Sequence, residues 1–216
     1  MPAASPLRVA FECGKTWTFA TALDWPGWCR RAKTAAGSEA ALEALLEYGD
    51  RYAAVLRAVG VLGAKRRFPA GQPEIIGSIP GNATTDFGAP GVPGPWDEDP
   101  LDAKEKRRRT KVLQACWDAF DLTVSGSAPK LVKGPRGGGR DRDQIADHVR
   151  DAERAYARKL GLKLPPRTPW PEQREAIVDA ILDKDADSGA WPLRYGINRT
   201  AWHVLDHAWE IEDKQP

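Results

Sequence analysis

Apolar and polar residues alternate over residues 7–12 and again over residues 17–21, on either side of the pair Gly14-Lys15. Alternation with a period of two is typical of a strand with one buried face. The two segments therefore predict a β-hairpin whose turn lies at Gly14-Lys15. A further short strand is predicted over residues 74–79, which contain three isoleucines.

A turn and then a helix are predicted after the hairpin. The dipeptide Pro26-Gly27 is a turn signal that ends the second strand. Apolar residues then keep helical spacing over residues 41–59. Ser38 lies just before this pattern, where a serine side chain can cap the first turn of a helix. The N-terminal third thus predicts a small antiparallel sheet with one helix.

A change of pattern divides the chain near residue 95. Nine of residues 80–100 are proline or glycine, which is typical of a linker or an extended covering segment. We expect a first domain of residues 1–95, including this linker, and a second domain of residues 100–216. The second domain predicts four amphipathic helices, over residues 101–124, 141–160 and 171–185 and from residue 197 or 198 onward. The expected fold class is α+β, a small antiparallel sheet with a helix followed by an up-down four-helix bundle.

Composition narrows the classes of function. The chain is 42% hydrophobic and 29% charged, as is typical of globular proteins, and its net charge of +2 gives no general case for nucleic acid. No apolar stretch approaches the length of a membrane span, and residues 1–7 lack a charged-then-apolar leader. The three cysteines are scattered and outside any C-x-x-C spacing. Reduced thiols and a cytoplasmic location are therefore expected.

Two basic segments have alternative interpretations. Residues 104–111 hold six lysines and arginines, which either contact phosphates or form a solvated helix face; the near-neutral total charge favours the solvated face. The glycine-rich loop 133–141 precedes a predicted helix N-terminus, where backbone N–H groups can bind an anion. Arg136 and Arg140 would then bind a substrate carboxylate or phosphate. The alternative is a plain flexible connection.

All three histidines of the chain fall on predicted helices. His203 and His207 are four residues apart, so their side chains lie on the same face of one helix. His148 lies at the border of the apolar stripe of another helix, from which it can point into a bundle. Three imidazoles that meet in one bundle are a candidate site for a divalent metal ion such as zinc or nickel. A histidine at a helix edge is, however, more often a packed or surface residue.

The C-terminal half resembles the DinB/YfiT-like superfamily of metal-binding four-helix proteins. The resemblance rests on residues 145–153 around His148 and residues 202–210 around His203 and His207. It implies a metal held by these three histidines. Characterised members are thiol-dependent S-transferases, a mycothiol-dependent isomerase and metal-dependent hydrolases. The resemblance therefore implies a metal-dependent enzyme with a small-molecule substrate, in which the metal activates water or a low-molecular-weight thiol co-substrate.

Further residues have expected roles around this site. Glu210 and Asp206 are candidates for catalytic carboxylates that orient an imidazole, although each is also an ordinary surface residue by its pattern. Trp202 and Tyr195 are candidates for lining the substrate cleft.

The N-terminal third resembles the HicB-like antitoxin module. The matching residues are Leu23, Asp24, Pro26 and Gly27, followed by residues 38–44. The resemblance implies a small αβ sheet used for partner binding or homodimerisation. An alternative function for the whole chain is therefore a non-catalytic binding or regulatory protein with a degenerate bundle. A sheet that only packs on the second domain remains a further alternative.

Overall fold

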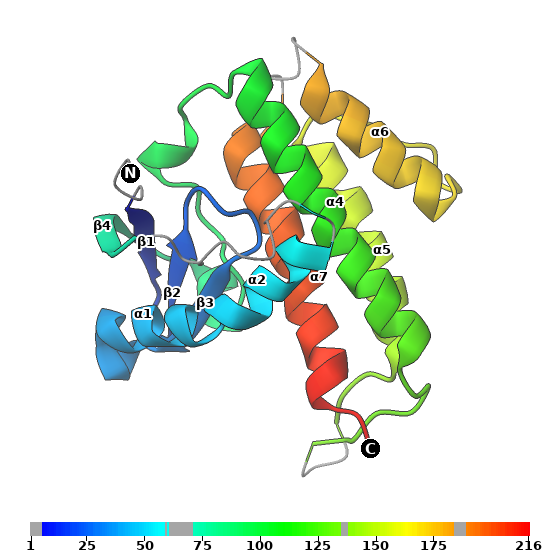
Figure 1. Cartoon of the computed structure of the whole chain (residues 1–216), viewed down its shortest axis with the longest axis horizontal. Helices are drawn as coiled ribbons and strands as arrows, with labels where there is room; N and C mark the ends of the chain where they lie inside the picture. Colours follow the sequence, from blue (N-terminus) through cyan, green and yellow to red (C-terminus); the bar gives the residue numbers. More distant parts are fainter. Residues whose placement is uncertain (1–5, 59, 61–70, 135–137, 184–188) are drawn as a thin grey trace. The chain divides into compact units, whose positions relative to one another are not determined.

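The structure is a computed structural model that describes residues 6–58, 60, 71–134, 138–183 and 189–216. The chain forms two compact units, Met1–Glu98 and Asp99–Pro216, and Figure 1 shows a sheet with helices in the first unit and packed helices in the second. The expected α+β class is confirmed. Among the described residues, no helix has the length and apolar character needed to cross a membrane.

The first unit contains a four-stranded sheet. Its strands are β1 (Leu7–Cys13), β2 (Trp17–Ala22), β3 (Cys29–Lys33) and β4 (Pro73–Pro80), in the spatial order β3-β2-β1-β4. The predicted hairpin is β1–β2, and the predicted isoleucine strand is β4. The sheet is mixed, however, because β4 runs parallel to β1. The expectation of a purely antiparallel sheet was therefore wrong: a long connection precedes β4, which allows it to run parallel to β1.

Two features of this unit escaped the sequence pattern. The strand β3 reads Cys-Arg-Arg-Ala-Lys and buries only Cys29, so it has no apolar alternation to reveal it. The predicted helix is two helices, α1 (Gly37–Glu47) and α2 (Gly49–Ala58), separated at Tyr48. Ala36 occupies the N-cap position of α1, so the prediction that Ser38 caps the helix was wrong.

The core of the first unit joins α1 and α2 to the turn after β2. Trp28 is fully buried, and its indole N–H donates to the carbonyl oxygen of Leu45 at 2.8 Å. The ring of Tyr52 stacks on Trp28 with centroids 5.5 Å apart, and the Tyr52 hydroxyl donates to the Pro26 carbonyl at 2.8 Å. The polar ends of both aromatic side chains are therefore satisfied inside the core.

The proline- and glycine-rich segment has structure of its own. It contains α3 (Ala83–Phe87), which begins with a capping box at Asn82, and a 3-10 helix at Pro95–Asp97. The buried carboxylate of Glu12 accepts hydrogen bonds from the backbone of Gly91 at 2.8 Å and from the hydroxyl of Thr85. This contact ties the segment to β1, so residues 80–98 belong to the first unit as a covering segment.

The second unit consists of α4 (Ala103–Gly126), α5 (Arg142–Lys159), α6 (Trp170–Leu182) and α7 (Leu193–Asp213). Contacts join α4 to the other three helices and join α5 to α6 and α7. The four predicted helices are thus present and pack together. The expected end of the third helix, at residue 185, lies outside the described residues.

The helix α7 begins at Leu193, four or five residues earlier than predicted. Gly196 lies inside the helix, and its N–H donates to the Pro192 carbonyl at 3.0 Å. A Cβ atom at this position would lie 2.3 Å from Cδ2 of Leu160 at the end of α5. Glycine is therefore explained by close packing between the two helices.

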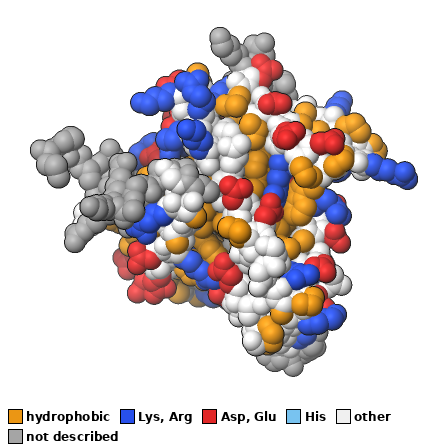
Figure 2. Space-filling view, turned by 45° about the vertical axis from the view of Figure 1, so that its right-hand side comes forward, with side chains coloured by type: hydrophobic (Ala, Val, Ile, Leu, Met, Phe, Trp, Pro, Cys, Tyr) orange, Lys and Arg blue, Asp and Glu red, His pale blue; other side chains and the backbone are white. Residues whose placement is uncertain are grey.

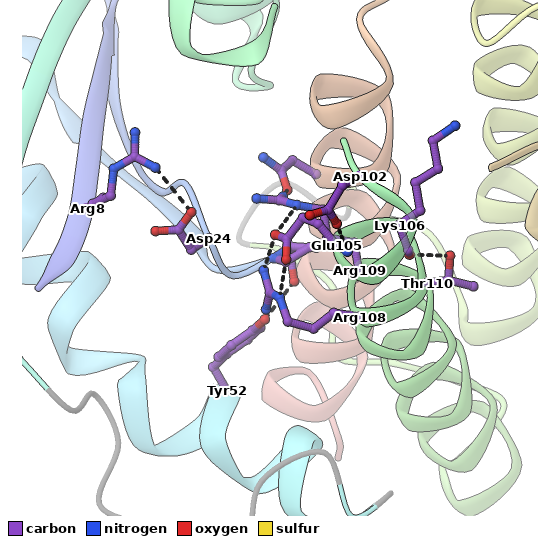
Figure 3. Close-up of polar contacts among 11 residues, drawn as sticks. Arg8, Asp24, Tyr52, Asp102, Glu105, Lys106, Arg108, Arg109 and Thr110 are labelled. Carbon is purple, nitrogen blue, oxygen red and sulfur yellow. Dashed lines mark hydrogen bonds and ion pairs between the residues drawn. The ribbon is translucent and has the colours of Figure 1, made fainter. Parts of the chain in front are cut away.

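The basic run at the start of α4 is partly buried. Arg109 is 0% exposed, and Glu105 accepts from it at 2.8 Å and from Arg108 at 2.6 Å. Figure 3 shows the two arginine side chains pointing toward Glu105. Asn198 on α7 accepts a further bond from Arg109 at 3.1 Å. Two arginines of the run thus have structural partners. In the view of Figure 2, basic and acidic side chains are interspersed over the described surface.

Candidate metal centre

The three histidines of the chain lie together between α5 and α7. The ring centroid of His148 is 5.0 Å from that of His203 and 5.0 Å from that of His207, and the two α7 rings are 4.6 Å apart. One ligand atom from each residue can be chosen so that all three lie within 4.8 Å of one another. This cluster could hold a metal ion.

The helices explain how the imidazoles converge. His203 and His207 are one helical turn apart on α7, and α5 packs directly against this helix. Fully buried apolar residues lie next to the histidines on both helices: Ile145 and Val149 are on either side of His148 on α5, and Val204 follows His203 on α7. The cluster therefore lies on two rigid helices and not on a loop.

One pair of nitrogen atoms already has the spacing that a tetrahedral ion would require. Nε2 of His203 lies 3.2 Å from Nε2 of His148. Two nitrogens bound to one tetrahedral zinc ion at about 2.0–2.1 Å would be about 3.3 Å apart. Nδ1 of His207 is hydrogen-bonded to Glu210 at 2.7 Å, which leaves its Nε2 as the available ligand atom. The arrangement offers a metal three nitrogen donors.

Burial keeps two of these imidazoles neutral. Burial, reinforced by the neighbouring His207, lowers the pKa of His148 below its ordinary value. The pKa of His203, which is only 6% exposed, is lowered further, first by burial and then by the charges of His207 and Arg199. A neutral imidazole can bind a cation without first losing a proton. The two side chains are thus prepared for ligation near neutral pH.

Glu210 connects the cluster to the last turn of α7. One of its oxygens accepts from His207 Nδ1 at 2.7 Å, and the other accepts from Lys214 Nζ at 2.5 Å. The hydrogen bonds from His207 and Lys214 lower the pKa of Glu210 to about 2, although partial burial acts in the opposite direction. The carboxylate is therefore ionised, and it fixes the ring orientation and the tautomer of His207.

The other predicted site residues lie at varying distances from the cluster. Trp202 is buried beside His203, with ring centroids 6.2 Å apart, while Tyr195 is buried against Trp191. Asp206 is half-buried next to His207 in sequence, and the role expected for it stays a prediction.

The two predicted loop arginines differ in what can be said of them. Arg140 is exposed just before α5, and its charge contributes to the lowered pKa values of His148 and His203. Arg136 lies outside the described residues. A carboxylate of the chain already occupies the N-terminus of α5. Asp141 forms a capping box there and accepts a hydrogen bond from Lys133 at 2.5 Å. An external anion at this helix end would have to displace Asp141.

Two neighbours of the cluster were not expected at the site. Tyr156 on α5 lies edge-on to His203, with ring centroids 5.5 Å apart. Arg199 is buried one turn before His203 on α7, and its guanidinium carbon is 4.8 Å from the ring centroid of Tyr156. The signal was present in the sequence, because Arg199 continues the four-residue spacing of His203 and His207 toward the N-terminus.

Comparison of the chain with protein-family models, with curated proteins and with solved structures finds no match. The class of the site therefore follows from its own residues. Three imidazoles on two packed helices, with a carboxylate behind one of them, form a candidate metal centre of the three-histidine type.

The carboxylate behind His207 allows a first prediction. We expect Glu210→Gln to weaken zinc binding by roughly 10- to 100-fold, the usual cost of losing an outer-shell partner. Competition with a chromophoric chelator measures the affinity. Glu175→Gln, at an exposed position on α6, is the control and should bind zinc as the unchanged protein does. Unchanged affinity in Glu210→Gln would contradict the orienting role.

Proposed function

We propose that this chain is a metal-dependent enzyme in which His148, His203 and His207 hold a divalent ion. The observation that carries the proposal is the convergence of the three imidazoles, with their ligand atoms within 4.8 Å of one another. A bound ion of this kind lowers the pKa of water or of a thiol and so supplies a nucleophile near neutral pH. The chain would act as a thiol S-transferase or as a hydrolase on a small molecule.

The proposed membership of the DinB/YfiT-like superfamily has support from the order of the ligands. The second of the four C-terminal helices supplies one histidine and the fourth supplies a pair four residues apart. Because the resemblance to this superfamily implies an up-down bundle, we infer the same topology for α4–α7. Zinc and nickel both accept imidazole nitrogen, and the cluster contains no thiolate that would favour one of them.

The residues of the chain would have distinct roles in this enzyme. The three imidazoles bind the ion and leave coordination positions for a nucleophile. Glu210 orients His207 through the 2.7 Å hydrogen bond. The rings of Tyr156 and Trp202 lie beside His203 and would limit the access of bulk water. A cytoplasmic location, where low-molecular-weight thiols stay reduced, suits this chemistry.

An alternative function is a non-catalytic binding protein, for which the first unit provides a specific observation. The strand β4 lies at an edge of the sheet, and its Ile75 is 49% exposed. An exposed edge can pair with a strand of another chain. We propose that the first unit is a HicB-like domain that binds a partner or a second copy through this edge, independently of the bundle.

Elemental analysis tests the proposed function. The full chain is purified without a metal-affinity step, and its metal content is measured beside that of His148→Ala. We expect about one divalent ion per chain, a single-site stoichiometry, lost in the variant. The metal-loaded chain should then catalyse thiol transfer or hydrolysis in a substrate screen. Absence of metal after incubation with zinc and nickel would contradict the proposal and favour the search for a protein partner.

A further inference from the structure

The helix α7 carries a row of functional groups that extends beyond the histidines. Tyr195, Arg199, His203 and His207 follow one another at intervals of four residues, so they lie along one face of the helix. Four residues advance an α-helix by about 6 Å. The guanidinium of Arg199 thus belongs to the same face as the metal ligands and begins one turn away from His203.

Two aromatic rings hold Arg199 in place. Its guanidinium carbon lies 4.8 Å from the ring centroid of Tyr156 and 4.6 Å from that of Trp202, and the residue is only 7% exposed. Aromatic rings interact with the flat faces of a guanidinium, whereas its N–H groups lie in the plane at its edge. The hydroxyl of Tyr156 also accepts a hydrogen bond from this guanidinium, so the two rings and the hydroxyl together fix its orientation for binding a planar anion through N–H···O bonds.

The charges around the cluster favour an anion. Arg199 and Arg140 both add positive potential at His203, where they lower the imidazole pKa. The carboxylate nearest to the ligands, Glu210, accepts hydrogen bonds from His207 and Lys214. Three neutral imidazoles would not compensate the two charges of a divalent ion. A negatively charged ligand would therefore reduce the charge imbalance of a partly buried site.

We propose that the metal centre takes a small carboxylate as its substrate and that Arg199 binds the carboxylate group. The inference rests on the proposed metal-dependent function. The one-turn spacing places the carboxylate a few bonds from the group that meets the metal. A carboxylate is the best match because it is planar and singly charged, as one guanidinium fork requires. Tyr156 and Trp202 act as positioning residues that hold the fork.

The test uses the full chain loaded with cobalt(II) and a matched pair of probes. The probes are 3-mercaptopropionate and its neutral amide, which offer the same thiol to the metal and differ only in the carboxylate. Thiolate binding is followed by the sulfur-to-cobalt charge-transfer absorption. We expect the acid to bind about 10- to 100-fold more tightly than the amide, the range of a charge-assisted hydrogen bond. Equal affinities in the unchanged protein would overturn the proposal.

Variants test whether Arg199 causes the preference for the acid over the amide. Arg199→Gln should lose it while the cobalt stoichiometry and the affinity for the amide stay unchanged. Arg158→Gln, an exposed arginine on α5, is the matched control and should keep the full preference. If Arg199→Gln does not fold, Arg199→Lys replaces it, with a reduced preference expected because an ammonium lacks the planar fork. A full preference in the position-199 variant would overturn the assignment.

Failure of the metal centre is distinguishable from failure of the carboxylate site. If the chain binds no cobalt, the proposed function fails, and the same two probes are titrated against the metal-free protein. Trp202 lies against the guanidinium, so the part of the tryptophan fluorescence change that is lost in Trp202→Phe reports binding there. A saturable change with the acid alone would support Arg199 as a carboxylate site. No change with either probe would overturn it.

Discussion

Replacing His203 with alanine is expected to weaken zinc binding by at least about 100-fold, because loss of a direct ligand should exceed the 10- to 100-fold cost of losing an outer-shell partner. His203 lies close to both of the other ligands in the cluster: its Nε2 is 3.2 Å from that of His148, and its ring is 4.6 Å from that of His207. Isothermal titration with zinc measures the change. We expect zinc to raise the unfolding temperature of the unchanged protein and not that of the variant.

Unfolding temperatures measured with and without zinc separate the loss of a metal ligand from the loss of packing in His203→Ala. His203 is buried, so alanine also leaves a cavity that lowers stability in both conditions. Its Nδ1 has no hydrogen-bond partner among the described residues, so the substitution breaks no bond at that atom. Thr200→Ser, at a buried position on the same helix, is the control and should keep zinc affinity. Tight zinc binding by His203→Ala would show that the ion is held elsewhere.

The candidate site could be predicted from the sequence because its information is local. The spacing of His203 and His207 places them on one helix face wherever the helix packs. The position of His148 at the border of an apolar stripe predicted that its side chain points toward a neighbouring helix. Arg199 was not singled out, although it continues the four-residue spacing of the histidines, because its burial among aromatic rings depends on the packing of α5 against α7, which the spacing alone does not specify.

The fold of the first unit was predictable where alternation was strong and not elsewhere. The strands β1 and β2 have clear apolar alternation, whereas β3 is polar and is a strand because it pairs with β2. The direction of β4 depends on a connection that spans residues 34–72. Neither pairing partner nor strand direction is contained in a short segment. These features therefore required the three-dimensional structure.

Glu105→Gln is expected to lower the stability of the second unit by about 3 kcal/mol. The hydrogen bond from Arg108, with the charges of Arg108 and Arg109, lowers the pKa of Glu105 from 4.5 to about 2 against the opposing effect of burial. Each pKa unit corresponds to about 1.4 kcal/mol. Glutamine removes the negative charge that compensates Arg109, which is fully buried. Hydrogen exchange of the α4 and α7 amides measures the change within this unit.

The pH dependence identifies the ionised carboxylate as the cause. The pKa of Glu105 is lower in the folded chain, so its stabilising effect is fully present above about pH 4.5 and is lost as the pH falls toward 2. The difference between the unchanged protein and Glu105→Gln should therefore be largest near pH 7 and should shrink across this window. Glu175→Gln should differ little from the unchanged protein at any pH, because its side chain is exposed. If the stability difference between the two proteins stays constant from pH 7 to pH 3, then the packing of the Glu105 side chain, and not its charge beside Arg109, stabilises the contact between α4 and α7.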